Sequence, residues 1–219
     1  MQLSRFQKLL SRFYPVRIYS FEGRTSPQMK LYHFRGRWQL ASESALYSDG
    51  DHYQPLTKAF AYIRGKLPAC RNMLVLGAGL GSAISVWESL KVPLPETLLV
   101  DIDEEILRLG RELNNRTNVR WICEDVQNLV RREQGTWDLI VLDIFQDRVV
   151  PHFVCTQDFL KNCARMLSTS GTLVFNYIIN NEQDWNALQQ LTGSLFITET
   201  VISIGINRIL ILKKAADES

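Results

Sequence analysis

The sequence predicts an α/β protein with a Rossmann-like, doubly wound sheet of seven mostly parallel strands, and three observations support this fold class. In Met73–Gly81 an apolar run leads directly into three glycines at alternate positions. From residue 72 onward, short apolar segments alternate with segments of helical periodicity, as in sheets whose strands are joined by crossover helices. Segments such as Leu139–Leu142 are apolar throughout, which is typical of strands buried on both faces.

The order of these segments defines the predicted elements of the main sheet. Two closing strands flank a turn at Gly205, and because no helix separates them we expect the last strand to be antiparallel. The predicted strands cover residues 73–77, 97–101, 118–122, 137–143, 171–178, 195–204 and 207–213, and the helices between them cover 81–91, 103–114, 126–133, 156–167 and 182–191.

The N-terminal quarter of the chain has a different pattern. An amphipathic helix is predicted first, and extended segments separated by turn residues then predict a small antiparallel β appendage over 16–48. A helix over 55–66 opens the main domain. We therefore divide the chain into an N-terminal helix and β-hairpin region (1–54), a main α/β domain (55–214) and a frayed tail (215–219).

Composition excludes several classes of protein. The 219 residues are 46% hydrophobic and 22% charged, which suits one large globular domain. No apolar run approaches the roughly 18 residues of a spanning helix, so we expect no membrane partner. Four cysteines without a Cys-x-x-Cys pair indicate reduced thiols and a cytoplasmic protein, and three scattered histidines give no metal site.

Positive charge is concentrated at the N-terminus. Residues 1–37 contain eight Lys or Arg and a single acid, Glu22. Such a surface could meet nucleic acid, but no aromatic and basic motif of an RNA-binding module is present. We favour a solvated face or a dimer contact and do not expect nucleic acid as a partner.

The three glycines and an acid 20 residues after them predict a nucleoside-binding site. Glycine allows positive φ and close approach of a ligand, and the helix that follows offers unpaired N–H groups. Asp101, at the tip of the next predicted strand, lies at the distance from which an acid accepts ribose hydroxyls. Nucleoside-cofactor binding is therefore favoured over a structural turn.

Carboxylates also follow the next two predicted strands. Because ligands of open α/β sheets bind at the carboxyl ends of strands, Asp125 and Asp143 are candidate site residues. Asp103 and Asp125 could instead cap the helices that begin after them. Asp143 follows a buried strand with no evident capping role, so a functional role is favoured.

Several segments, taken in order, resemble the spermidine-synthase-like proteins of the class I S-adenosylmethionine-dependent transferase superfamily. Each segment is generic for the fold, but together they are specific for this family and cover roughly residues 30–212. The segments are Leu46–Leu56, Gly77–Gly81, the strand ending at Asp101, Asp138–Asp143, Thr156–Leu160 and Asn207–Ile211.

The resemblance implies a cofactor, which would be S-adenosylmethionine or its decarboxylated form. Gly77, Gly79 and Gly81 would line its methionine or aminopropyl portion. Asp101 would hold the ribose hydroxyls, and Asp125 would accept from the adenine amino group.

The resemblance also implies the catalytic groups. Asp143 would take the place of the aspartate that relieves an attacking amine of its proton. Tyr53 would lie over the active site with Gln54, which would touch the cofactor. Members of the family are commonly dimers through their N-terminal β regions, so a homodimer is an option for this chain.

Departures from the family pattern argue against a polyamine substrate. Leu80 replaces an acid that pairs with the ammonium of the decarboxylated cofactor, and Pro55 replaces a glutamate. Gln146 replaces the second acid of an Asp-x-x-Asp pair, and the next acid, Asp147, follows one residue after that position. Binding a di- or triamine out of water requires matched carboxylates, so their loss disfavours spermidine synthesis.

Three functions are favoured on the sequence over a fourth, hydride transfer by a nicotinamide cofactor, because the glycine loop lacks the Gly-x-x-Gly spacing that brings helix and pyrophosphate together. The leading hypothesis is methyl transfer from S-adenosylmethionine to a small-molecule acceptor. The first alternative is a polyamine aminopropyltransferase whose acceptor site is rebuilt with Asp147, Glu124 or Asp51. The second is a non-catalytic nucleoside-binding scaffold protein.

Overall fold

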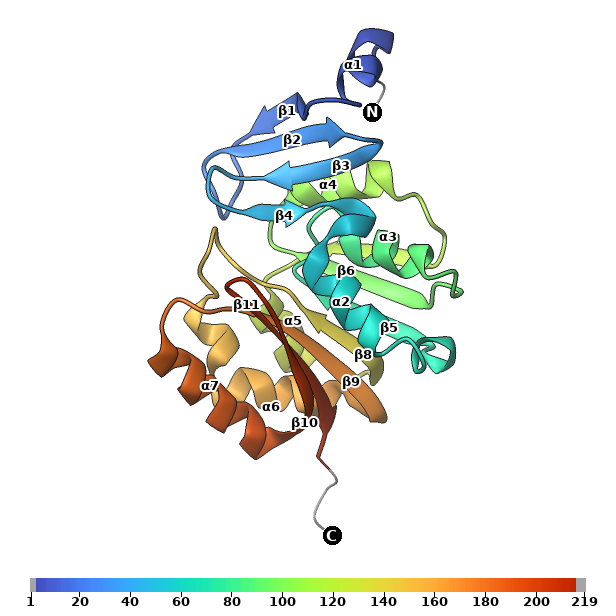
Figure 1. Cartoon of the computed structure of the whole chain (residues 1–219). Coiled ribbons are helices and arrows are strands. Elements are labelled where there is room, and N and C mark those ends of the chain that lie inside the picture. Colours follow the sequence, from blue (N-terminus) through green and yellow to red (C-terminus); the bar gives the residue numbers. More distant parts are fainter. Residues whose placement is uncertain (1–2, 216–219) are drawn as a thin grey trace.

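The main sheet has seven strands in doubly wound order, as the sequence predicts. The computed structural model describes residues 3–215, and its elements are drawn in Figure 1. The strands lie side by side in the order β10-β11-β9-β8-β5-β6-β7. Their bounds are β5 (Asn72–Leu76), β6 (Glu96–Asp101), β7 (Val119–Cys123), β8 (Trp137–Leu142), β9 (Leu167–Ile178), β10 (Phe196–Ile204) and β11 (Asn207–Lys214).

The direction of the strands also agrees with the prediction. β5 to β9 form a parallel set, whereas β11 lies between β9 and β10 and is antiparallel to both. The fold class read from the sequence, a mostly parallel Rossmann-like sheet with an antiparallel last strand, is therefore confirmed.

Helices cover both faces of this sheet, which explains the uniformly apolar strands. In β8, Ile140 and Leu142 pack into the core beneath α5, α6 and α7. Leu139 and Val141 point to the opposite face and pack beneath α2 and α3. The helix bounds are α2 (Gln54–Tyr62), α3 (Ser82–Ser89), α4 (Glu104–Leu113), α5 (Val126–Arg132), α6 (Gln157–Met166) and α7 (Glu182–Leu195). Short 3₁₀ turns cover Gly50–His52, Leu67–Ala69 and His152–Cys155.

Three elements differ from their predictions by four residues at one end. The helix α7 continues to Leu195 rather than ending at 191. The first helix of the main domain ends at Tyr62 rather than at 66, and a 3₁₀ turn follows it. β9 begins at Leu167 rather than at 171, because the chain leaves α6 directly into a strand that pairs with Trp137 across an irregular register.

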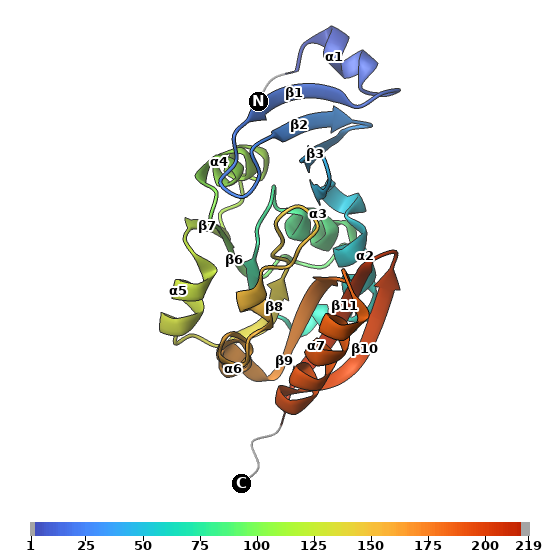
Figure 2. The ribbon, with the colours of Figure 1, turned by 90° about the vertical axis from the view of Figure 1, so that its left-hand side faces the viewer.

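The predicted N-terminal appendage is a four-stranded antiparallel sheet at one end of the molecule (Figures 1 and 2). Its strands are β1 (Val16–Phe21), β2 (Met29–Phe34), β3 (Arg37–Ala41) and β4 (Leu46–Ser48). Met29, Leu31 and Leu40 pack against Ile106 and Leu109 of α4. The appendage therefore shares a core with the main domain, and the boundary at residue 54 stays a prediction.

The N-terminal helix α1 (Arg5–Leu10) is attached by polar groups. Ser11, just after it, is buried; its hydroxyl lies 2.8 Å from Nδ1 of His33, and its carbonyl accepts from the Arg35 N–H at 2.7 Å. The apolar side of the helix faces outward, so that Phe6 is 72% and Phe13 66% exposed.

The predicted tail falls largely on residues 216–219, which lie outside the described residues. Within residues 3–215, no helix has both the length and the apolar character that crossing a membrane requires.

Candidate active site

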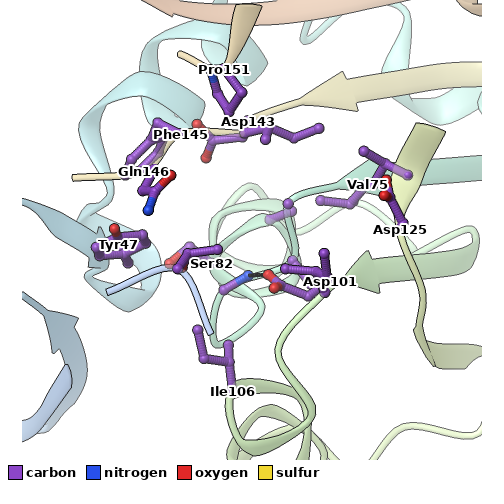
Figure 3. Close-up of a pocket in the computed structure, with 18 of the residues that line it drawn as sticks. Tyr47, Val75, Ser82, Asp101, Ile106, Asp125, Asp143, Phe145, Gln146 and Pro151 are labelled. Atoms are coloured by element: carbon purple, nitrogen blue, oxygen red, sulfur yellow. Dashed lines mark hydrogen bonds between the residues drawn. The ribbon is translucent and has the colours of Figure 1, made fainter. Parts of the chain in front are cut away.

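A cavity of about 250 Å³ lies where the carboxyl ends of β5, β6, β7 and β8 meet. Figure 3 shows Asp101 and Asp125 on one side of it, Tyr47 and Phe145 on the other, and Asp143 between them. The other lining residues are Thr25, Leu56, Val75, Gly77, Ala78, Gly79, Ser82, Ala83, Ile102, Ile106, Val126, Gln127, Ile144, Gln146, Pro151 and Phe153. The cavity is thus mostly apolar, and its ionisable lining residues are three aspartates and Tyr47.

The backbone conformation of the turn after β5 requires glycine. Gly77 has φ +91°, and a Cβ there would lie 2.2 Å from the carbonyl oxygen of Asp143. Gly79 has φ +50°, and its Cβ would lie 2.5 Å from Oγ of Ser48. Glycine is therefore the residue that lets three chain segments meet at the floor of the cavity.

Gly81 has a different position from the other two glycines. It takes φ +85° at the N-cap of α3, where an added Cβ would meet the Trp121 ring at 2.9 Å. It does not belong to the cavity lining. Its role toward a cofactor stays a prediction from the resemblance, while the structure gives it a role in turning the chain into α3.

Asp101 is held rigidly at the end of β6. Its Oδ2 accepts from the Gly79 N–H at 3.2 Å, and its Oδ1 accepts from the Asp103 N–H at 3.1 Å. Burial raises the pKa of this carboxyl to about 6, although both backbone hydrogen bonds oppose the shift. Each oxygen keeps acceptor capacity toward the cavity, as a carboxylate that binds a diol needs.

Two other aspartates cap helices, as the sequence allowed. Asp103 is buried and its Oδ1 accepts from the N–H groups of Glu105 and Ile106 at the start of α4. Asp125 accepts from the Gln127 N–H at 2.8 Å at the start of α5, yet it also lines the cavity. Capping by one oxygen leaves the other oxygen of Asp125 for a ligand.

Asp143 lies at the centre of a hydrogen-bonded network. Its Oδ1 accepts from the Asn176 side chain at 2.7 Å and from the Tyr53 hydroxyl at 3.3 Å. Asn176 in turn accepts from the Asn207 side chain at 2.9 Å. Burial raises the pKa of Asp143 to about 6, and the hydrogen bonds from Asn176 and Tyr53 partly oppose this.

Tyr53 contacts Asp143 from behind the cavity. Its side chain is 5% exposed and does not line the cavity. Burial and the Asp143 carboxylate raise the pKa of this hydroxyl well above its usual value, so it stays a protonated donor. The two residues predicted as catalytic are therefore in contact, and their catalytic roles stay predictions.

Gln54 is exposed at the first position of α2 and does not belong to the cavity lining. Its predicted contact with the cofactor therefore stays an expectation from the resemblance. Pro55, next to it, is buried within the same helix.

Leu80 is buried and does not belong to the cavity lining. It packs with Leu31 and Leu40 of the N-terminal sheet and with Ile106 of α4. The structure thus gives its side chain a packing role between the two sheets, and its bearing on cofactor choice stays an expectation from the resemblance.

The carboxylates considered for a rebuilt amine site have other partners. Asp147 accepts from the Ser42 hydroxyl at 2.6 Å and from that of Ser26, both in the N-terminal region. Glu124 pairs with Arg132 on α5. Asp51 is exposed outside the cavity.

Sequence reasoning missed several residues of the site. Tyr47 and Phe145 stack at 4.9 Å between ring centroids and form a wall of the cavity. Tyr47 lies in the segment that carried the resemblance, so it could have been proposed. Asn207 likewise lies in a segment that carried the resemblance. No local signal marked Asn176, because its contact with Asp143 joins two different strands.

Comparison with known proteins bears on the fold and on the family. Residues 74–175 match the family model of a methyltransferase domain. A probable spermidine synthase from Corynebacterium glutamicum superimposes with a TM-score of 0.75 at 20% identity, over 89% of this chain and 79% of that one. The chain has a spermidine-synthase-like class I methyltransferase fold. Human methyltransferase-like protein 13, in complex with SAH, has a TM-score of 0.62 at 16% identity, over 77% and 83% of the two chains.

Relatives found by sequence are of two kinds. A polyamine aminopropyltransferase from Clostridium botulinum is 29% identical over 114 residues, covering 49% of this chain. An electron transfer flavoprotein beta subunit lysine methyltransferase from Xenopus laevis is 37% identical over 108 residues, covering 47%. The matches span 40% and 39% of the relatives' own lengths. The resemblance to spermidine-synthase-like proteins of the class I superfamily is therefore confirmed.

Proposed function

We propose that the protein is an S-adenosylmethionine-dependent transferase that moves a methyl group to a small-molecule acceptor. The observation that carries the proposal is the composition of one cavity. It joins a nucleoside-type site around Asp101 and Asp125 to a compartment with aromatic walls and one carboxylate, Asp143.

The residues present fit a cofactor of the S-adenosylmethionine type. Asp101 would hold the ribose hydroxyls, and the free oxygen of Asp125 would accept from the adenine amino group. Ile102 and Val126 supply apolar surface for a flat base. The methyltransferase-domain match and neighbours solved with SAH or with AdoDATO support the same cofactor class. When bound, the cofactor supplies an electrophilic carbon attached to a sulfonium.

The acceptor side of the cavity suits an uncharged molecule with an apolar body. Tyr47 and Phe145 form its wall, and no Lys, Arg or His belongs to the cavity lining in the described part of the chain. Positioning by such walls is the main requirement for an in-line transfer. Asp143 would orient the acceptor or accept its proton, and a pKa of about 6 leaves the carboxylate ionised at neutral pH.

Charge argues against a polyamine in the same compartment. A diamine brings two ammonium groups, and burying each one requires a carboxylate partner. With Asp101 and Asp125 assigned to the cofactor, Asp143 alone remains. Asp147 and Glu124, which could have supplied the second charge, are bound to Ser42 and Arg132.

Aminopropyl transfer is the second candidate, because several relatives carry that name. It would need a conformational change that releases Asp147 from the N-terminal region. A second carboxylate would then face the cavity beside Asp143.

Calorimetry distinguishes these functions. We expect S-adenosylmethionine to bind at least as tightly as its decarboxylated form, and Asp101→Asn to weaken both. Clear preference for the decarboxylated form, together with an aminopropylated product from putrescine, would favour the second candidate. Binding without turnover of any acceptor would instead favour the nucleoside-binding scaffold.

A further inference from the structure

The carboxylate of Asp143 receives its hydrogen bonds unevenly. Both side-chain donors, the Asn176 amide and the Tyr53 hydroxyl, reach Oδ1. Within the described residues, no hydrogen bond reaches Oδ2. Because Asp143 lines the cavity and neither donor does, the two donors hold the carboxylate from behind.

The neighbour of Asn176 determines which way its amide points. The Asn207 side chain donates to Oδ1 of Asn176 at 2.9 Å, so the amino group of Asn176 faces Asp143. The opposite orientation of Asn176 would set its amide oxygen against the Asp143 carboxylate and, with Asn207 unchanged, two amino groups against each other. Asn176 is 1% exposed, so solvent is poorly placed to relieve either contact.

We infer that Asn176, locked by Asn207, is a positioning residue that fixes the Asp143 carboxylate and leaves Oδ2 as its proton-accepting oxygen. The inference rests on the proposed function in one respect, the origin of the proton. In the proposed transfer the proton comes from an N–H or O–H group of the acceptor. That proton moves to Oδ2, and the carboxylate becomes a carboxylic acid.

The arrangement also sets when Asp143 is ionised. The titratable residue in contact with it is Tyr53. Asp101 of β6, Asp125 at the start of α5 and Tyr47 of β4 line the same cavity. Burial raises the pKa of Asp143 to about 6, whereas the Asn176 donor stabilises the charged form. Removing that donor should therefore raise the pKa further.

A titration of the protein without cofactor tests this directly. The ¹³C signal of the Asp143 carboxyl, assigned through its loss in Asp143→Asn, is followed against pH. We expect Asn176→Leu to raise the midpoint by about one pH unit, the scale of one hydrogen bond to a charged group. Asn207→Ala should raise it less, because its effect passes through Asn176.

The double variant Asn176→Leu with Asn207→Ala shows whether Asn207 acts on the pKa of Asp143 through Asn176 or independently of it. If Asn207 acts only through Asn176, the double variant titrates like Asn176→Leu alone. Asn118→Ala is the control, since its side chain binds the carbonyls of Leu94 and Pro95 at the opposite end of the sheet. Its midpoint should match the unmodified protein.

An unchanged midpoint in Asn176→Leu, or an additive double variant, would overturn the inference. If Asn176→Leu does not fold, Asn207→Ala decides alone, and no shift there would overturn the lock. The readout needs neither cofactor nor acceptor. A missing shift thus contradicts this inference, whereas a missing transfer activity contradicts the proposed function.

Discussion

Gly77 is the residue at which backbone conformation and site geometry are most closely linked. The positive φ of Gly77 already favours glycine, and the carbonyl oxygen of Asp143 lies where the Cβ of any other residue would have to be. The same close approach holds the glycine turn against the segment that carries the proposed base. The residue therefore matters for the shape of the cavity as well as for stability.

We predict that Gly77→Ala destabilises the protein and weakens cofactor binding, because the turn must move away from Asp143. Strain at a positive φ costs on the order of 1–3 kcal/mol, and the clash adds to it. Thermal unfolding and calorimetry measure the two effects.

Gly36→Ala is the matched control for that prediction. Gly36 has φ +81°, but an added Cβ would meet nothing within 4 Å. It should show the strain without the loss of binding. Equal unfolding temperatures for the two variants would show that the contact with Asp143 is unimportant.

The N-cap of α4 is tied to a loop that borders the site. Asp103 binds two N–H groups of the helix with Oδ1, and its Oδ2 accepts from the Arg24 N–H at 2.6 Å. Arg24 belongs to the loop between β1 and β2, next to Thr25 of the cavity lining. One side chain thus joins a helix start to the loop that borders the cavity.

We predict that Asp103→Ala lowers the free energy of unfolding by more than an ordinary N-cap, which is worth about 1 kcal/mol. Asn181→Ala is the comparison, because both hydrogen bonds of the Asn181 side chain go to Asp184 within the first turn of α7 and none reaches another element. Chemical denaturation gives both values. A smaller loss for Asp103→Ala than for Asn181→Ala would contradict a tie to the Arg24 loop.

At the scale of the molecule, the apolar side of α1 faces away from the fold rather than toward it. Ser11, just after the helix, contacts the fold, while Phe6 and Leu9 of the helix and Phe13 in the turn beyond it are exposed. Because an exposed apolar stripe is unfavourable in water, it is typical of an interaction surface. We propose that this stripe contributes to the homodimer that the resemblance allows.

The expected outcome is a dimer by sedimentation, converted to a monomer by Phe6→Ser combined with Phe13→Ser. Thermal stability of the monomer should change little, because both side chains contact little of their own chain. Ile197→Ser is the control, since Ile197 is 55% exposed on β10 in the other sheet. A monomeric unmodified protein would contradict the proposal.

The fold was predictable because its signals are local. A strand covered on both faces must be apolar throughout, as in Leu139–Leu142, and each following helix shows its own periodicity. The limits of β9 were not predictable, because its first residues pair with Trp137 outside the apolar pattern.

The candidate site residues at strand ends and in the glycine turn could also be predicted from the sequence. Gly77 and Gly79 are demanded by backbone conformation, and Asp101 and Asp143 follow apolar strands with little structural reason to be charged. Their roles toward a cofactor and an acceptor stay predictions.

The sequence by itself thus determined the sheet, the glycine turn and the aspartates at the strand ends, since each depends on residues close together in the chain. Only the tertiary structure decided how the remaining polar groups are used. It turned Leu80 into the core, bound Asp147 to Ser42 and placed Asn176 behind Asp143. Side-chain partners of this kind lie more than 30 residues apart, and packing between elements, rather than local pattern, brings them together.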